Sequence, residues 1–329
     1  MTNSFWENLP RPFFILAPME DVTDVAFRQM FAKYGRYSDN ASNRRGPDVF
    51  WTEFTSADGL LKGGWERLKH QLFYEENERP IVAQLFSAHP DRMEGAAQLC
   101  AQLGFDGIDI NMGCPSSTVC DNGCGCGLIK QPELARDIIQ AAKEGAGSIP
   151  ISVKTRTGFH ESELETWVPA LLAAEPAVLI MHGRTRNEMS DVPNGWEEIM
   201  RTVEIRDELA SETLIVGNGD ITSLEEGKQR AKETGVEGIM VGRAAFGNPW
   251  FFNPEINRED LSADKRLGVM AEQAKSFDEL LPNQHFAIMR KHFKAYTRGL
   301  PEANNLRDQL MQTADAKEVK AIVEKYLEN

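Results

Sequence analysis

The chain has 329 residues, of which 41% are hydrophobic and 26% charged, and its 36 Lys and Arg against 50 Asp and Glu give a net charge of −14. This composition excludes collagen-like, disordered and disulfide-scaffold proteins, and no apolar run approaches the ~20 residues that a membrane span requires. The strong acidity argues, at first sight, against a nucleic acid as partner.

Eight short apolar runs recur along the chain and predict buried β-strands. Their nearly continuous apolar character is typical of parallel strands that are covered on both faces. Helix signals separate them, among them first-turn prolines at Pro90 and Pro132 and a capping-box spacing between Ser223 and Glu226. The predicted strands span residues 13–19, 49–54, 81–86, 107–113, 151–156, 177–184, 213–220 and 238–243.

This alternation predicts an α/β fold, a (β/α)8 TIM barrel, over residues 1–253. A doubly wound sheet is the rival architecture, although it usually has fewer strands. The polar, turn-rich residues 36–48 form an insertion, which we expect to lengthen a loop at or near the mouth of the barrel. Residues 254–329 predict an all-helical C-terminal domain, with helices at 264–281, 284–299 and 315–327.

In such a barrel, functional groups gather at the C-terminal ends of the strands and in the loops that follow. Nearly every predicted strand of this chain ends in side chains that hydrogen-bond or carry charge, and this concentration indicates an enzyme. The strand-end residues are Pro18, Met19, Glu20, Glu53, Gln84, Asn111, Cys114, Lys154, Arg156, His182, Arg184, Asn218, Gly219, Asp220, Gly242 and Arg243.

The last two strand ends, GNGD and GR, combine glycines with an arginine. Barrels often bind phosphate there through backbone N–H groups, so we expect a phosphorylated cofactor or substrate, with simple tight turns as the alternative. Lys154 and His182 are candidates to hold an electron-rich ring and its negative charge, or else are solvated and structural groups. No metal is expected, because no zinc-type spacing accompanies His182.

Four of the five cysteines fall in one glycine-rich loop, NMGCPSSTVCDNGCGCG. Their spacing, C-x5-C-x3-C-x-C, matches no standard zinc or iron–sulfur pattern. Cys114 differs from Cys120, Cys124 and Cys126 because it follows the strand end directly, the position of a reactive or proton-donating thiol. The odd number of cysteines and the lack of a signal-peptide pattern predict a reducing compartment, the cytoplasm.

Taken together, the motifs resemble the bacterial-type tRNA-dihydrouridine synthases, a family of flavin-dependent tRNA-modifying enzymes. The similar stretches keep their order from residue 16 to about residue 250, and RKHFKAY and LRDQLM extend the resemblance into the helical tail. The stretches are LAPMEDVTDVAFR, TEFTSADGL, ERPIVAQLF, GFDGIDINMGCP, VKTRTG, HGRTR, GNGDI and VGRAAFGNPW.

The resemblance implies an FMN cofactor in the mouth of the barrel and NADPH as its reductant. The flavin would pass a hydride from N5 to C6 of a tRNA uracil, and Cys114, which matches the family's catalytic cysteine, would protonate C5 to give 5,6-dihydrouridine. The sequence departs from the family at Glu20, where a small residue is usual, and in NEMSDVPNGW, which lacks an expected aromatic residue. Carried over by motif, the flavin contacts are Pro18, Met19, Glu20, Gln84, Lys154 and His182, with the phosphate end at Asn218, Gly219, Asp220, Gly242 and Arg243.

The helical tail answers part of the objection from charge. Residues 262–329 carry eleven Lys and Arg against ten Asp and Glu, and no acidic residue lies between Glu279 and Glu302. The basic residues of this stretch fall within a helical arc of about 100°, beside an apolar arc, and this predicts a stripe that binds tRNA phosphates. A solvated basic face is the alternative. The basic stripe consists of Arg290, Lys291, Lys294 and Arg298, and the further predicted substrate contacts are Asn111, Arg156, Arg184 and Arg186.

Three other functions remain open from the sequence. The chain is alternatively a barrel flavoenzyme that reduces a free pyrimidine or another small molecule, an rRNA-directed dihydrouridine synthase, or an RNA-binding protein that has lost catalysis. The basic tail, with Arg184 and Arg186, argues against the first, and Cys114 with Lys154 argues against the last. We expect a monomer that does not contact a membrane.

Overall fold

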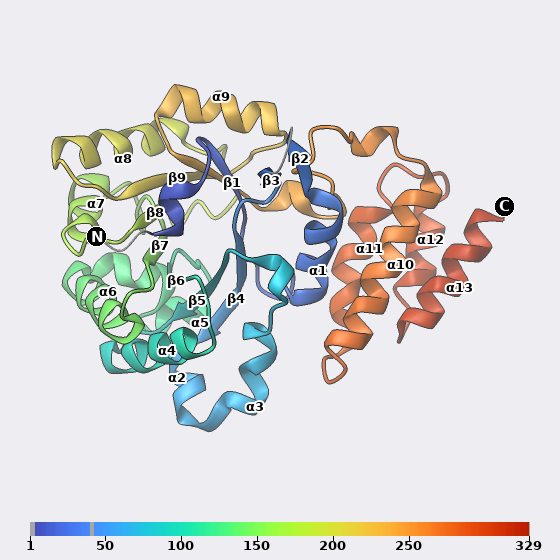
Figure 1. The fold of residues 1–329 in the computed structure, drawn as a ribbon, viewed down its shortest axis with the longest axis horizontal. Helices are drawn as coiled ribbons and strands as arrows, with labels where there is room; N and C mark the ends of the chain where they lie inside the picture. The colour runs from blue at the N-terminus through green and yellow to red at the C-terminus, as the bar shows by residue number, and fades with distance from the viewer. Residues whose placement is uncertain (1–3, 40–42, 329) are drawn as a thin grey trace.

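The computed structural model describes residues 4–39 and 43–328, and its largest element is a closed barrel of eight parallel strands (Figure 1). The strands pair in the order β1–β10–β9–β8–β7–β6–β5–β4, and a parallel bridge between Ile15 and Val49 closes the ring. In chain order they are β1 (Phe13–Leu16), β4 (Phe50–Ser56), β5 (Ile81–Phe86), β6 (Gly107–Met112), β7 (Ile151–Arg156), β8 (Val178–His182), β9 (Leu214–Asn218) and β10 (Gly238–Val241).

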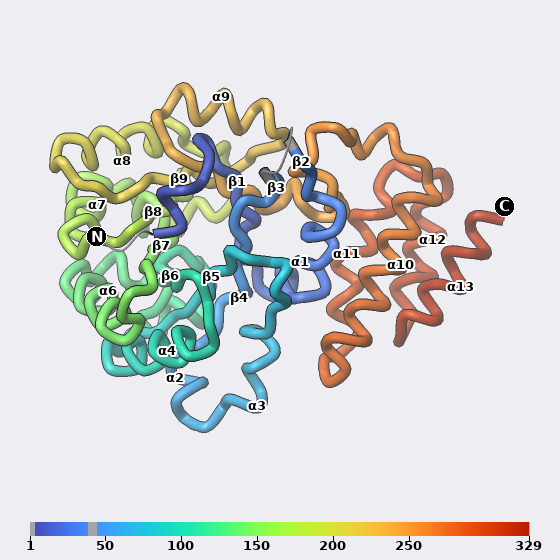
Figure 2. The backbone as a smooth tube through the Cα atoms, in the orientation of Figure 1, coloured from blue at the N-terminus to red at the C-terminus, as the bar shows by residue number. Residues whose placement is uncertain are grey.

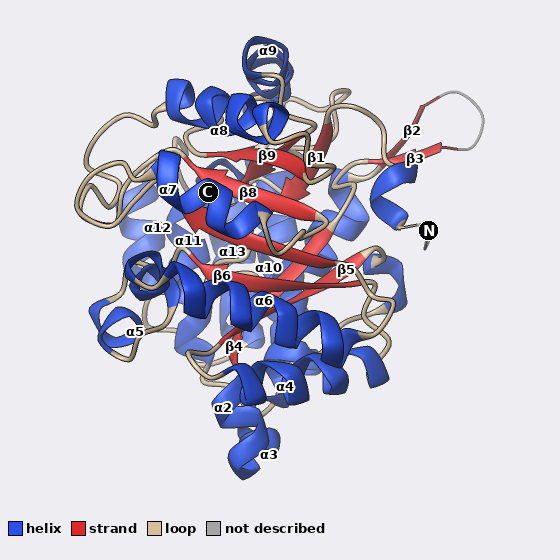
Figure 3. Cartoon of the chain, turned by 90° about the vertical axis from the view of Figure 1, so that its left-hand side faces the viewer, coloured by secondary structure: helices blue, strands red, loops and turns tan. Residues whose placement is uncertain are grey.

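Helices connect successive strands and cover the outside of the barrel (Figure 3), so the predicted (β/α)8 architecture is confirmed. Two of them begin at the prolines that the sequence marks, Pro90 and Pro132, and the hydroxyl of Ser223 caps a third by accepting the N–H of Glu226. The helices are α1 (Val25–Met30), α2 (Ala57–Gly59), α3 (Trp65–Leu68), α4 (Pro90–Gln102), α5 (Ser117–Asp121), α6 (Pro132–Ala146), α7 (Leu164–Leu172), α8 (Trp196–Glu208) and α9 (Leu224–Thr234).

Aromatic side chains close the N-terminal end of the barrel. Trp6, in the short 3-10 helix η1 (Phe5–Asn8), packs against Phe13 and Trp51, with ring centroids 5.6 and 5.8 Å from its own. These side chains belong to the apolar core inside the strands. Because this end is filled, the polar strand ends at the opposite end surround the open mouth of the barrel.

Several strands end earlier than the sequence suggests. β1 stops at Leu16, and the carbonyl of Met19 then accepts the N–H groups of Val22 and Thr23 in a turn. β8 and β9 likewise end at His182 and Asn218, before the polar residues that follow them. Those residues therefore lie in the loops of the mouth, where their side chains are not committed to the sheet.

The insertion at residues 36–48 is a hairpin, and our expectation that it lies at the mouth is wrong. Its antiparallel strands are β2 (Tyr37–Asp39) and β3 (Asn43–Arg45), while residues 40–42 lie outside the described part. It precedes β4, so it lies at the N-terminal end of the barrel, opposite α5 in Figure 3. Arg36 at its base donates to the carbonyls of Asn77 and Arg79, which come just before β5.

The tail contains four α-helices where the sequence predicts three. The helix that the sequence does not predict is α12, which begins after Glu302, a residue with a φ of 47° at its N-cap. The predicted helix at 284–299 is shorter than expected, since a 3-10 turn, η9 (Phe286–Met289), precedes α11 and Arg298 follows its end. Within the described residues, no helix is long and apolar enough to cross a membrane. The tail helices are α10 (Ala263–Leu280), α11 (Arg290–Tyr296), α12 (Ala303–Leu310) and α13 (Ala316–Leu327).

The tail and the barrel share a second apolar core. The tube in Figure 2 shows α10 and α11 alongside α1, and the buried side chains of Val25, Ala26 and Met30 on α1 pack with those of the tail. Arg258, in the connecting segment, donates to the carbonyls of Gly247 and Ala295 and so ties barrel to tail. The tail residues of this core include Leu267, Met270, Phe277, Phe293, Tyr296, Leu306 and Val323.

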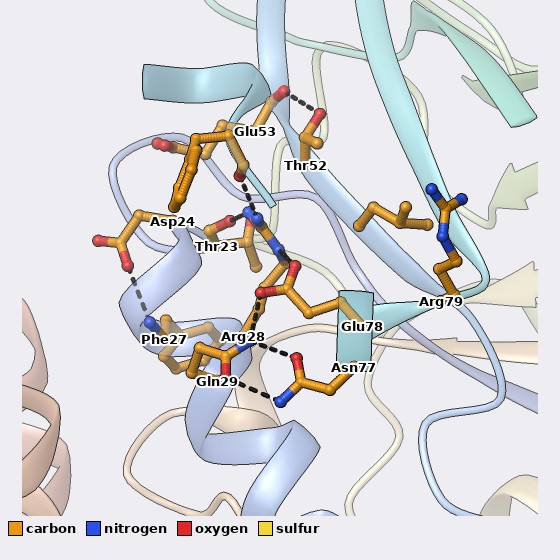
Figure 4. Close-up of polar contacts among 12 residues, drawn as sticks. Thr23, Asp24, Phe27, Arg28, Gln29, Thr52, Glu53, Asn77, Glu78 and Arg79 are labelled. Atoms are coloured by element: carbon orange, nitrogen blue, oxygen red, sulfur yellow. Dashed lines mark hydrogen bonds and ion pairs between the residues drawn. The ribbon is translucent and has the colours of Figure 1, made fainter. Parts of the chain in front are cut away.

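A buried polar cluster lies where α1 meets β4 and the segment before β5 (Figure 4). Arg28 is 1% exposed and its Nε lies 2.6 Å from Oε2 of Glu78, which is fully buried. Its Nη1 and Nη2 donate to the carbonyls of Thr23 and Phe73, at 2.7 and 2.6 Å. Burial, together with the nearby Asp24 carboxyl, raises the pKa of Glu53 to about 8. The cluster thus holds one buried cation among several carboxyl groups.

Glu53→Gln is expected to stabilise the protein at alkaline pH. The folded-state pKa of Glu53 is raised, so the unfolded chain ionises first, and stability is lost as pH rises from roughly 4.5 to about 8. In that window the wild type should lose roughly 1 kcal/mol per pH unit relative to the variant. Urea unfolding of both proteins at several pH values measures this difference. A constant difference across the window would contradict the assignment.

Candidate active site

A cavity of about 320 Å³ opens at the mouth of the barrel, a volume in the range of small-molecule sites. Residues from or directly after all eight barrel strands line it. Most of the predicted site residues are among them: Pro18, Met19, Gln84, Asn111, Cys114, Lys154, Arg156, His182, Arg184, Asn218, Gly219, Asp220, Gly242 and Arg243.

The remaining predicted residues do not line this cavity. Glu20 is exposed beside the cavity-lining Met19, and Arg186 lies under the cysteine loop, its guanidinium carbon 5.5 Å from the ring centroid of Phe159. The basic stripe belongs to the tail. Conversely, the lining includes residues that are not among the predicted ones: Ala17, Phe54, Gly113, Pro115, Ser190, Ile221 and Met240. Phe54 directly follows Glu53, which the strand pattern marks, whereas nothing in the sequence distinguishes Ser190.

Asn111 fixes the start of the cysteine loop. Its Oδ1 accepts the N–H groups of Gly113 and Cys114, at 3.1 and 2.9 Å, and its Nδ2 donates to Oε1 of Gln84 at 3.1 Å. The amide oxygen of Asn111 is therefore committed to the backbone that carries Cys114. Asn111 therefore has a structural contact in addition to the role in substrate binding that the sequence predicts.

A buried carboxylate beneath these amides sets their orientation. Oδ2 of Asp109 accepts a hydrogen bond from Nε2 of Gln84 at 2.7 Å, and its Oδ1 accepts one from the hydroxyl of Ser152 at 2.6 Å. Because Asp109 accepts from the Gln84 amide nitrogen, the Gln84 oxygen faces Asn111, whose own oxygen then faces Cys114. Burial raises the pKa of Asp109 to about 6. In the sequence, Asp109 is distinguished only as a single carboxylate within an apolar strand.

Cys114 is half-buried at the edge of the cavity. Burial raises the pKa of its thiol, and the Glu20 carboxyl adds to the effect, so the group stays protonated at neutral pH. A protonated thiol beside a cavity is a proton donor rather than a nucleophile.

The wall formed by β7 and β8 is cationic around a neutral histidine. Burial, together with the charge of the neighbouring Arg156, lowers the pKa of Lys154 to about 8. Burial also holds the pKa of His182 well below its usual value, and the charges of Lys154, Arg156 and Arg184 act in the same direction. Near pH 7, Lys154 is therefore largely charged while His182 is neutral. This combination suits a ligand that carries or develops negative charge.

Two arginines and a carboxylate line the cavity after β8, β9 and β10. Asp220 pairs with both Arg184 and Arg243, and although burial opposes it, these charges lower the Asp220 pKa. The side chain of Arg243 is 65% exposed, whereas that of Arg184 is 2% exposed. Gly219 has a φ of +131°, and a Cβ there would lie 2.1 Å from the side-chain oxygen of Asn194, so only glycine fits.

The arginines predicted to touch substrate are largely held by backbone carbonyls. Arg156 donates to the carbonyls of Gly113, Thr185 and Met189, at distances from 2.8 to 3.1 Å. Arg184 donates from Nε to the carbonyl of Val192 at 2.8 Å. Both side chains therefore brace the loops after β6 and β8 while they face the cavity.

The basic stripe lies beside the mouth. Nζ of Lys291 is 2.8 Å from Oδ2 of Asp21, in the loop after β1, so α11 reaches the rim of the cavity. Lys294 and Arg298 are exposed, and Arg290 is half-buried. His292, on the same helix, is fully buried and stacks 6.0 Å from Phe246; burial lowers its pKa to about 3. It is therefore neutral and adds no charge to the stripe.

Comparison with known proteins gives a consistent result. The family model of the dihydrouridine synthases matches residues 15–329. A probable tRNA-dihydrouridine synthase 2 of Bacillus subtilis (strain 168) is 41% identical, over 99% of this chain and 97% of its own length. A probable tRNA-dihydrouridine synthase of Staphylococcus aureus (strain COL) is 40% identical, over 99% and 96%.

Similarity to solved structures is slighter. A morphinone reductase in complex with tetrahydroNAD superposes with a TM-score of 0.47 and 12% identity, over 79% of this chain and 88% of its own. Among the residues that the structure describes, no group of three or more His, Cys, Asp or Glu side chains is arranged to hold a metal ion.

Proposed function

This chain belongs to the dihydrouridine synthase family, and from that premise we propose that it reduces uridines of tRNA to 5,6-dihydrouridine, with FMN as cofactor and NADPH as reductant. One observation carries the proposal. Cys114, Lys154 and His182 line the same cavity as the glycines and arginine of the last two barrel loops, so a proton donor faces a site built for an anionic ligand.

The residues of the cavity fit a flavin mononucleotide. Its phosphate requires cations and backbone N–H donors, which Arg243, Gly219 and Gly242 offer at one end. Its ring requires amide partners and a cation, which Gln84 and Lys154 offer at the other end. We assign Pro18 and Met19 to the ring end and Asn218 to the phosphate end.

When bound, FMN supplies the hydride that adds to C6 of the uracil. Lys154 keeps its proton through Asp109, whose nearby charge opposes the effect of burial on the lysine, and so stabilises negative charge in the cavity. Cys114 holds a proton on Sγ and delivers it to C5 of the uracil. Asn111 keeps the Cys114 backbone in place while the thiol acts.

The target uridine must leave its stack to enter the mouth, since a base within a helix is out of reach. The basic stripe, on α11 and just after it, supplies cations next to the mouth for the phosphates of the same RNA. Because the barrel is strongly negative, we expect tRNA binding to be confined to the basic stripe and the adjacent mouth, and to weaken steeply as the salt concentration rises.

The direct test is mass spectrometry of tRNA after incubation with the purified protein, FMN and NADPH. The expected result is a gain of two hydrogens at defined uridines. Free uridine and rRNA, incubated in parallel, separate the alternatives. Reduction of free uridine but not of tRNA would identify a small-molecule flavoenzyme, and reduction of rRNA alone would identify an rRNA-directed enzyme.

Lys294→Glu combined with Arg298→Glu is expected to weaken tRNA binding roughly tenfold or more and to lower the salt slope of log K by about 2, one for each lost cation. Both side chains are exposed, so folding should not suffer. Filter binding at several salt concentrations measures both quantities.

A matched control applies the same change of charge away from the mouth. Lys317→Glu with Lys320→Glu alters α13, which lies on the side of the tail remote from the barrel (Figure 1). Equal loss of affinity in both double variants would show that general charge, and not the stripe, determines binding.

A further inference from the structure

Three cysteines of the loop after β6 have no part in the proposed reaction, and two of them lie against the backbone of Cys114. The carbonyl oxygen of Cys114 lies 3.3 Å from Sγ of Cys120 and 3.1 Å from the backbone nitrogen of Cys126, which donates to it. Cys120 lies in the short helix α5, which follows Cys114. Cys126 lies in the 3-10 helix η6 (Gly125–Lys130). The two residues therefore hold the same carbonyl from two sides.

The backbones of these two segments are in close contact. A Cβ on Gly127 would lie 2.8 Å from the carbonyl oxygen of Cys120 and 3.5 Å from its Cα. A Cβ on Gly125 would lie 2.7 Å from the Cys114 oxygen. The glycines on either side of Cys126 thus allow it to approach Cys120, and the Cys126 side chain is near enough to the Cys120 sulfur to influence its pKa.

The surroundings of Cys120 favour its thiolate. The Cys126 thiol, the Arg186 guanidinium and the Gly127 N–H all act on the sulfur, and they lower the Cys120 pKa to about 6, with Cys126 the largest cause. Cys120 is half-buried, whereas Cys126 is fully buried. An accessible thiolate next to a second thiol is the arrangement of a redox-sensitive pair.

We propose that Cys120 and Cys126 form a reversible disulfide when the protein meets a peroxide, and that this bond is a modification site within the loop of Cys114. The peroxide is the oxidant, by chemical class a hydroperoxide such as hydrogen peroxide. Cys120 is the residue that the peroxide oxidises, and Cys126 is the resolving thiol.

The two steps balance as follows. The Cys120 thiolate attacks one oxygen of hydrogen peroxide; an S–O bond forms, the O–O bond breaks, and hydroxide leaves, so sulfur is oxidised to a sulfenic acid as the peroxide is reduced. The Cys126 sulfur then attacks the Cys120 sulfur; an S–S bond forms, the S–O bond breaks, and the departing oxygen takes the Cys126 proton to leave as water. A dithiol restores both thiols by exchange.

The disulfide changes the support of Cys114. An S–S bond of about 2.05 Å is shorter than any contact between two separate thiols, so its formation draws the Cys120 sulfur toward Cys126 and away from the Cys114 carbonyl, which it contacts at 3.3 Å. Displacement of a reacting group by about 1 Å can cost about 100-fold in rate. We therefore expect the oxidised protein to lose about tenfold or more of its dihydrouridine formation and to regain it with dithiothreitol.

The test uses the full chain, reduced and then treated with a small excess of hydrogen peroxide, followed by alkylation and cleavage before aspartate. Cleavage before Asp109 and Asp121 places Cys114 and Cys120 in one peptide and Cys124 and Cys126 in the next. The expected result is that mass spectrometry finds these two peptides joined by a bond that dithiothreitol breaks. This readout does not depend on enzymatic activity, so it stands apart from the proposed function.

Single variants identify the linked residues. The linkage should persist in Cys124→Ser, the matched control, and should disappear in both Cys120→Ser and Cys126→Ser. In Cys126→Ser, dimedone should label Cys120 as the sulfenic acid. A linkage that survives Cys120→Ser, or labelling of Cys114 with Cys120 and Cys126 fully alkylated, would overturn the proposal.

Discussion

Cys114→Ala is expected to lower dihydrouridine formation by about 10²–10⁴-fold, the usual contribution of a positioned general acid. The pKa of the thiol is raised by burial, so the proton it delivers is present at neutral pH, and alanine has none to give. Mass spectrometry of tRNA under single-turnover conditions measures the rate.

The flavin content of this variant distinguishes catalysis from binding. The Asn111 contact is to the Cys114 backbone and survives the change, so the cavity should keep its shape and its cofactor. The flavin absorbance of the purified variant should therefore equal that of the wild type. A colourless protein would mean that Cys114 supports the cofactor. Cys124→Ser is again the matched control, since the Cys124 thiol donates to the nearby Asn122 carbonyl and not to the Cys114 backbone.

Arg28→Ala should destabilise the fold by about 3–5 kcal/mol, because it leaves Glu78 as a buried carboxylate without its cation. It also removes the donors that hold the carbonyls of Thr23 and Phe73. Urea unfolding measures the loss. Replacement of both partners, Arg28→Met with Glu78→Leu, should cost less than Arg28→Ala alone, since it leaves no unpaired charge behind.

A neighbouring exposed pair provides the comparison for this prediction. Lys33 follows α1 and pairs with Glu272 of α10, with the lysine side chain 56% exposed. Lys33→Ala should change stability by less than about 1 kcal/mol, since solvent screens such a pair. Similar losses in Lys33→Ala and Arg28→Ala would contradict the importance that we give to burial.

The barrel and most of its mouth could be predicted from the sequence because each depends on local pattern. An apolar run followed by a polar residue marks both a strand and the place where it ends, and parallel strands bring those ends together. Gln84, Lys154 and His182 were found in this way, although they are far apart in the chain.

What the sequence could not show depends on contacts between distant segments. Nothing local reveals that Arg28 meets Glu78, or that Asp109, one residue in an apolar strand, orients the amides above it. The direction of the hairpin at residues 36–48 follows from topology, since a segment before a strand lies at the opposite end from the mouth. The sequence predicts substrate contacts for Arg156 and Arg184, but it does not show that backbone carbonyls of neighbouring loops hold both side chains.

The core shared by α1 and the tail has a consequence for how the molecule melts. If the tail were removed, Val25, Ala26 and Met30 would lose their cover, and α1 carries Arg28, the cation of the buried cluster, on the same six residues. Barrel and tail are therefore expected to unfold as one cooperative unit. A single calorimetric transition, with equal calorimetric and van't Hoff enthalpies, is the signature of such a unit.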